Sequence, residues 1–112
     1  MCKVLSGENS GRDTWPLPVE RIQFIRAAGS SVDIRSGNRD YEMRTSMKKL
    51  QETLPPWQFV RVHRSYIVNL YEIDRVSASR TGNDSVMLRC GRKIIVGKKY
   101  RSQLLSSITQ TL

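Results

Sequence analysis

The fold is decided around residues 59–70, which read Phe-Val-Arg-Val-His-Arg-Ser-Tyr-Ile-Val-Asn-Leu. Apolar and polar residues alternate from residue 59 to residue 63, and this pattern predicts a strand. The polar step His63-Arg64-Ser65 follows, and after it an apolar turn. An arginine at a strand end can donate two parallel hydrogen bonds to guanine, and a serine hydroxyl can hold a phosphate oxygen. On charge pattern alone, an ordinary solvated loop with Arg64 in water fits this step about equally well.

Upstream of this stretch the sequence predicts three strands and a helix. Short runs with β-branched or aromatic residues cover 21–28, 32–35 and 41–44, separated by the turn-forming segments 29–31 and 36–39. Met47, Leu50 and Leu54 then recur at helical spacing after Thr45-Ser46, and Pro55-Pro56 stops the pattern. One amphipathic helix is therefore expected, with its apolar stripe packed on the strands.

Downstream, the pattern predicts further strands and a closing helix. Together with 59–63, the runs 73–78, 86–90 and 93–96 are expected to be strands, the last two forming a hairpin around Gly91-Arg92. Tyr100, Leu104 and Ile108 recur every four residues, so residues 98 to about 108 are expected to be helical. The whole pattern predicts a β-rich α+β domain with two short helices.

The first turn of the closing helix carries Lys98, Lys99 and Arg101. Cations at a helix N-terminus oppose the macrodipole by about a few tenths of a kcal/mol each, so their presence there needs another reason. A bound phosphate would supply that reason, because the free N–H groups of the turn and the lysines would converge on it.

Length and charge limit the class of protein. The 112 residues fit one domain. The 19 Lys and Arg residues against 10 Asp and Glu residues leave a net charge of +9, which is typical of proteins that bind nucleic acids or other anionic partners. From Ser85 onward there are six basic residues and no acidic ones, so this half is expected to face the anion. Residues 1–18, rich in Gly, Ser, Asn and Pro, are interpreted as a leader or linker, and residues 19–112 as the domain.

Several functional classes find little support. Cys2 and Cys90 lie far apart and outside any zinc-binding spacing, so neither a metal nor another cofactor is expected. No stretch is apolar enough for a membrane span or a signal peptide, which suggests a cytoplasmic protein. His63, the sole histidine, lacks a nucleophile pattern around it, and a hydrolase that pairs it with Asp74 or Glu72 is the weakest hypothesis. A hydrogen-bonded structural histidine is the favoured interpretation.

Four runs together resemble a known family. They cover residues 22–30, 46–54, 59–70 and 93–100, and the most specific is Phe-x-Arg-x-His-Arg-Ser-Tyr-Ile-Val-Asn within residues 59–69. Over about residues 18–108 the chain is similar to a LytTR-type (LytR/AlgR family) DNA-binding domain. The resemblance implies a mostly β fold of small, elongated antiparallel sheets whose loops, rather than a recognition helix, enter successive major grooves. It also implies a non-catalytic protein.

The resemblance implies a role for particular residues. By position, the base-contacting residues would be Ser30, Arg64 and Lys98. The phosphate-contacting set would be Ser31, Ser46, Ser65, Gly97, Lys99 and Arg101. The family often has Ser-Arg where this chain has Gly97-Lys98, which replaces a bidentate fork by a point charge.

The partner implied is double-stranded promoter DNA with repeated half-sites, which two copies of the chain would bind as a homodimer on DNA. Such domains are usually the output half of bacterial response regulators. The chain is then either a stand-alone regulator or part of a longer one with a receiver domain and a sensor kinase as partners. An RNA-binding or ribosome-associated module is the alternative, because positive charge alone does not separate RNA from DNA.

Overall fold

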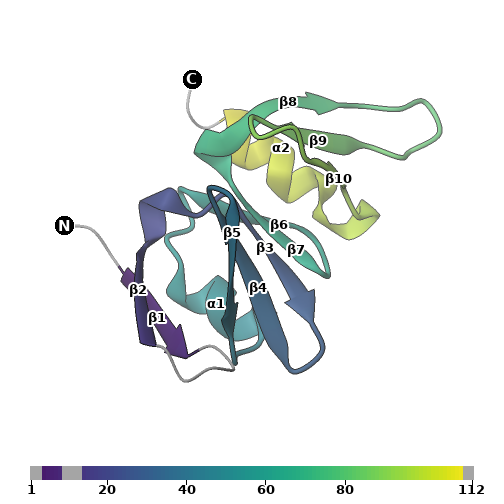
Figure 1. Cartoon of the computed structure of the whole chain (residues 1–112). Coiled ribbons are helices and arrows are strands. Elements are labelled where there is room, and N and C mark those ends of the chain that lie inside the picture. Colours follow the sequence, from purple (N-terminus) through teal and green to yellow (C-terminus); the bar gives the residue numbers. More distant parts are fainter. Residues whose placement is uncertain (1–3, 9–13, 110–112) are drawn as a thin grey trace.

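A computed structural model describes residues 4–8 and 14–109 of the chain (Figure 1). The first two strands, β1 (Val4–Glu8) and β2 (Thr14–Pro18), pair with each other as an antiparallel hairpin. The structure here differs from the expected leader or linker over residues 1–18, because Trp15 and Leu17 of β2 are buried in a hydrophobic core. Where the domain begins stays a prediction.

The main sheet has five antiparallel strands in the order β5-β4-β3-β7-β6. The predicted strands upstream appear as β3 (Phe24–Ala28), β4 (Ser31–Ser36) and β5 (Arg39–Met43). The predicted strand after the helix appears as β6 (Phe59–His63). These four predictions are confirmed, with ends that shift by up to three residues.

The strand β7 (Tyr66–Asn69) lies between β3 and β6, where the sequence predicted an apolar turn. That prediction was wrong because Ile67 and Val68 are buried on opposite faces of the sheet, in two different cores. A strand buried on both faces shows no alternation, so its pattern resembles a short apolar run. Asn69 is buried too, and its side-chain amide donates to the Ile22 carbonyl at 2.7 Å.

The first core lies between one face of this sheet, the β1–β2 hairpin and the helix α1 (Met47–Thr53). Ser46 caps α1, since its hydroxyl accepts a hydrogen bond from the Lys49 amide at 3.1 Å. The helix ends before Pro55-Pro56, as predicted. Met47 and Leu50 point into the core beside Ile25 and Ile34, so the predicted apolar stripe of the helix packs on the strands.

The second core is covered by a three-stranded antiparallel sheet in the order β10-β9-β8 and by the closing helix. Its strands are β8 (Ile73–Ser77), β9 (Ser85–Leu88) and β10 (Lys93–Ile95), which confirms the three predicted strands and the hairpin around Gly91. Single 3-10 turns precede β3 (η1, Val19–Arg21) and β8 (η2, Leu70–Glu72).

The closing helix is divided in two. A 3-10 turn, η3 (Lys98–Tyr100), comes first, and the α-helix α2 (Arg101–Thr109) follows it. Lys98 and Lys99 therefore precede the α-helix, whereas the sequence predicted them in its first turn. Leu104 is fully buried in the second core and anchors α2 to β6. The mostly β fold class with antiparallel sheets and two short helices is confirmed over the described residues.

Candidate nucleic-acid interface

Strand register brings two turns to the same end of the five-stranded sheet. Ala28 pairs with Ser31, which leaves Gly29 and Ser30 as the β3–β4 turn, with Gly29 at φ +64°. His63 pairs with Tyr66, which leaves Arg64 and Ser65 as the β6–β7 turn. The two turns are joined because the Ala27 amide donates to the Ser65 carbonyl at 2.8 Å.

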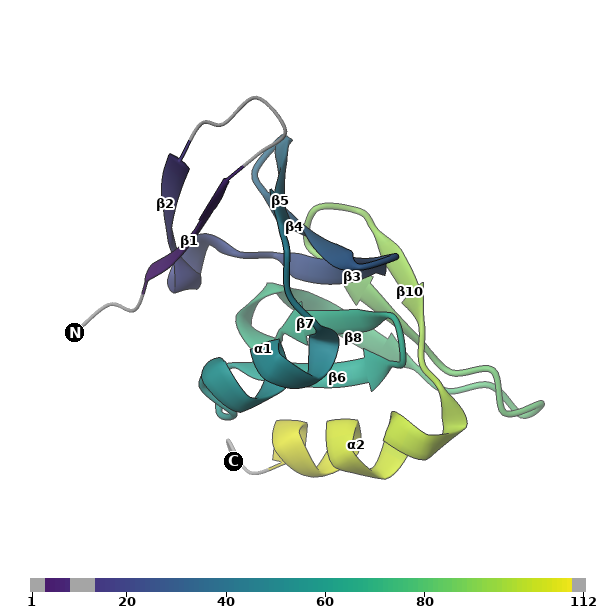
Figure 2. The same cartoon turned by 90° about the horizontal axis from the view of Figure 1, so that it is seen from below.

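The start of η3 is the third member of this group. The Gly97 amide donates to the Val62 carbonyl at 2.7 Å, which fastens the segment to the end of β6. A Cβ at Gly97 would lie 3.1 Å from Cδ2 of Tyr100 and 3.8 Å from Cα of His63. We call the two turns and the segment Gly97–Lys99 together the turn edge; in Figure 2 they follow one another along the right-hand side of the molecule.

The β6–β7 turn is held in shape by its neighbours. Nη2 of Arg61 donates to the Arg64 carbonyl at 2.6 Å, while its guanidinium lies 5.6 Å from the ring centroid of Tyr100. Nδ1 of His63 accepts a hydrogen bond from the Ser65 amide at 3.1 Å. The hydrogen-bonded structural role predicted for His63 is confirmed. The backbone of the turn is thus fixed without help from the Arg64 side chain, which stays exposed.

The serines differ in what their hydroxyls already do. Ser30 is exposed at the tip of its turn, and Oγ of Ser31 donates to the Ala28 carbonyl at 3.2 Å. Ser46 lies near the same end of the sheet, because β5 ends at Met43 opposite Val32, but its hydroxyl caps α1. A donor proton remains on the capping hydroxyl of Ser46, which accepts rather than donates in the cap.

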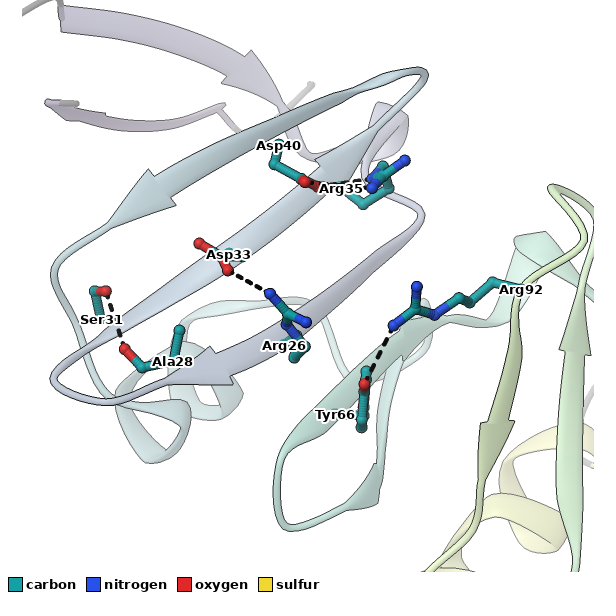
Figure 3. A network of polar contacts seen from close by, with 8 residues as sticks. All are labelled: Arg26, Ala28, Ser31, Asp33, Arg35, Asp40, Tyr66 and Arg92. Atoms are coloured by element: carbon teal, nitrogen blue, oxygen red, sulfur yellow. Dashed lines mark hydrogen bonds and ion pairs between the residues drawn. The ribbon is translucent and has the colours of Figure 1, made fainter. Parts of the chain in front are cut away.

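Charge is distributed unevenly between the turn edge and the face of β3, β4 and β5 that carries Arg26 and Arg35, which we call the outer face of the sheet. On that face Arg26 pairs with Asp33 at 2.9 Å, and Arg35 pairs with Asp40 at 2.7 Å (Figure 3). The hydrogen bond that Arg26 donates to the Asp33 carboxylate raises the pKa of the Arg26 guanidinium. Arg64, Lys98 and Lys99 form no ion pair within the described part of the chain. The turn edge therefore carries positive charge with which no carboxylate of the described residues pairs.

Arg101 behaves differently from the other predicted site cations. Its Nε lies 2.7 Å from Oδ2 of Asp84, a carboxylate whose side chain is only 6% exposed. Asp84 ends the loop between β8 and β9, residues 78–84, and no residue of this loop was among the predicted site residues. The run Arg80-Thr81-Gly82-Asn83, a polar glycine-containing turn with a cation, was the signal that could have found it.

The described residues hold no cluster of metal-ligating side chains. Within residues 4–8 and 14–109 there is no group of three His, Cys, Asp or Glu side chains that could hold a metal ion. His63 contacts the Ser65 amide, while Asp74 pairs with Arg75 at 3.3 Å. No helix in the same ranges is long and apolar enough to cross a membrane.

Comparisons with known proteins show what the chain is similar to. A family model described as the LytTr DNA-binding domain matches residues 12–109. The transcriptional regulatory protein LytR of Staphylococcus aureus is 32% identical over 92 residues, which are 82% of this chain and 37% of that protein. A response regulatory protein of Yersinia pestis is 27% identical over 88 residues, 79% of this chain and 36% of that protein. The chain thus spans about a third of the length of these curated relatives.

A solved structure shares the fold. It is the LytTr DNA-binding domain of a Bacillus cereus response regulator, and it matches with a TM-score of 0.84 at 19% sequence identity. The match covers 94% of this chain and 95% of that one.

Proposed function

The chain belongs to the family of LytTr DNA-binding domains, and from this membership we propose that it binds double-stranded DNA in a sequence-specific way through its turn edge. The observation that carries the proposal is the exposed, unpaired positive charge of Arg64, Lys98 and Lys99 on neighbouring turns of one end of the sheet. Turns that project from a rigid sheet can enter a major groove about 12 Å wide, and the phosphates on either side attract the surrounding cations.

Within this proposal, Ser30, Arg64 and Lys98 contact bases. All three are exposed, and each projects from a separate part of the turn edge, so each would meet a different part of the duplex. Arg64 suits a bidentate contact with guanine. Lys98 supplies a point charge instead, which discriminates less between acceptors.

The phosphate contacts are proposed for the residues around these three. They are Ser31, Ser46 and Ser65 through their hydroxyls, Lys99 through its charge, and Gly97. The N–H of Gly97 already donates to the Val62 carbonyl, so Gly97 would contact a phosphate without a hydrogen bond. The Ser31 hydroxyl would have to rotate away from the Ala28 carbonyl to reach one. Arg101 also matches this set by sequence, and its pairing with Asp84 gives it a role of its own, argued in the next subsection.

The biological setting proposed is transcription regulation in the bacterial cytoplasm. The relatives are named response regulatory and transcriptional regulatory proteins, and each is nearly three times as long as the segment matched here. We infer that the domain acts as the output part of such a regulator, or as a stand-alone one, on promoter DNA with repeated half-sites. Two copies on adjacent half-sites would then form a homodimer on DNA, and a receiver domain and sensor kinase would control it.

Selection of preferred sequences from a random duplex library tests the proposal. The winning duplex and a scrambled one are then titrated between about 50 and 200 mM salt. We expect two short half-sites about one helical turn apart, and a preference for the winner that survives added salt. Tight binding without preference that collapses as salt rises would refute sequence-specific recognition, and RNA would then be tested as the ligand.

A further inference from the structure

Asp84 is the most heavily engaged carboxylate near the turn edge. Its Oδ1 accepts a hydrogen bond from the Ser79 amide at 3.1 Å, and its Oδ2 pairs with Nε of Arg101 at 2.7 Å. Its backbone carbonyl accepts from the Val96 amide at 2.9 Å. A buried carboxylate is retained only where such partners compensate its desolvation, so all three contacts fix its place.

These contacts lie on both sides of the lysine-bearing turn. Val96 immediately precedes Gly97 and Lys98, and Arg101 immediately follows η3. Asp84 therefore holds the chain before and after the turn and sets the separation between the two ends. The same residue closes the loop 78–84, and a Cβ placed on Gly82 of that loop would lie 3.9 Å from Cε of Lys98. The loop thus packs beside the lysine side chain, next to the start of α2 (Figure 2).

The charge of Arg101 is largely offset where it stands. A cation 2.7 Å from a buried carboxylate contributes less to counterion release from DNA than a free one, because the carboxylate repels the same phosphate. Lys98 and Lys99 have no such partner among the described residues. The pair is therefore better suited to hold the turn than to hold a phosphate.

We propose that Asp84 and Arg101 form a latch that positions Lys98 and the loop 78–84 at the DNA interface, with Arg101 a positioning residue rather than a phosphate ligand. The proposal rests on the proposed function, since it assigns a role within the same interface. The latch makes the discrimination between DNA sequences depend on a carboxylate that touches no DNA.

The test is the ratio of the dissociation constants for the scrambled and the selected duplex, measured for Asp84→Asn. This substitution removes the charge and leaves an amide oxygen that can still accept from the Ser79 amide. Removing a negative charge tightens binding to both duplexes alike, so the ratio isolates the positioning effect. We expect the ratio to fall about tenfold, within the range that one lost base contact costs. If Arg101 were instead a phosphate ligand, its release would strengthen both complexes and leave the ratio unchanged.

Asp33→Asn is the matched control. It makes the same charge change in another Asp–Arg pair, that of Asp33 with Arg26 at 2.9 Å on the outer face of the sheet (Figure 3). The ratio should stay at the wild-type value in this variant. Arg101→Lys, which keeps a cation opposite Asp84, should retain most of the ratio, and Arg101→Gln should lose it.

Thermal unfolding of each variant sets a binding temperature at which all of them are folded. Should Asp84→Asn not fold, the pair Arg101→Gln and Arg101→Lys decides the question, because the Arg101 side chain is 54% exposed and its replacement opens no cavity. A wild-type ratio near one would overturn the proposed function together with the latch. A high wild-type ratio that survives both Asp84→Asn and Arg101→Gln would overturn the latch alone.

Discussion

Replacing Arg64 by alanine gives the sharpest test of sequence recognition by the turn edge. The side chain can be removed without disturbing the turn, because Arg61 bonds to the Arg64 carbonyl and His63 bonds to the Ser65 amide. The expected loss is therefore that of one bidentate base contact, about 1–3 kcal/mol or roughly 5- to 150-fold in Kd, on the selected duplex. On a scrambled duplex the loss should stay below about threefold. Fluorescence anisotropy with the two labelled duplexes measures both values.

Arg39→Ala is the matched control for this experiment. Arg39 is also exposed and lies beside a hairpin turn, at the start of β5, but the β4–β5 turn lies at the other end of β4 from the turn edge. Its removal takes away the same charge, so it should weaken both complexes only slightly. Equal losses for Arg64→Ala on the two duplexes would show that Arg64 holds a phosphate. Equal effects of the two variants would refute the assignment of the interface to the turn edge.

Three further outcomes are expected. Lys99→Ala should weaken binding to the selected and the scrambled duplex alike and flatten the slope of log K against log salt by about one unit. An unchanged slope in salt titrations would remove Lys99 from the phosphate contacts. Gly97→Ala should lower the free energy of unfolding, measured in urea, by about 1–3 kcal/mol, because the new Cβ would lie 3.1 Å from the Tyr100 ring. An unfolding midpoint equal to that of the parent would show that the ring moves aside freely. Leu104→Ala should lower the free energy of unfolding by about 2–5 kcal/mol in the same urea experiment, since Leu104 is fully buried in the second core. A decrease under about 1 kcal/mol would mean that α2 contributes little to stability.

Local chemistry was sufficient to predict most elements of this domain. The Ser46 cap and Pro55-Pro56 delimit α1 from within a few residues, and alternation marks β6. The pattern failed where burial depends on distant parts of the chain. β7 is buried by two cores at once, and β2 is buried through Trp15 and Leu17 despite its two prolines. The residues that bury β7 and β2 lie far from them in the sequence, so a short stretch of sequence does not reveal them.

The candidate site, too, could be predicted only in part from local sequence. The His63-Arg64-Ser65 step was identified from its own residues, and the structure places it in a tight turn beside the Gly97–Lys99 segment. The partner of Arg101 was not foreseen, because Asp84 lies 17 positions earlier and becomes its neighbour only when β9 and β10 pair. Charge patterns along a sequence indicate which cations exist, while the fold decides which of them remain available to a ligand.

The double burial of β7 also has a consequence for the order in which the domain forms during synthesis. The first core needs Phe59 of β6 and Ile67 of β7, so the segment through α1 leaves the ribosome without the residues that complete it. The second core shares β6 and β7 as its wall, includes Phe24 of β3, and waits further for Leu104. Neither half of the chain contains a complete core, and cutting the domain between α1 and β6 should leave two fragments that cannot fold independently. The nascent chain should therefore stay sensitive to proteases until β7 has emerged, and its protection should become complete only once α2 has followed.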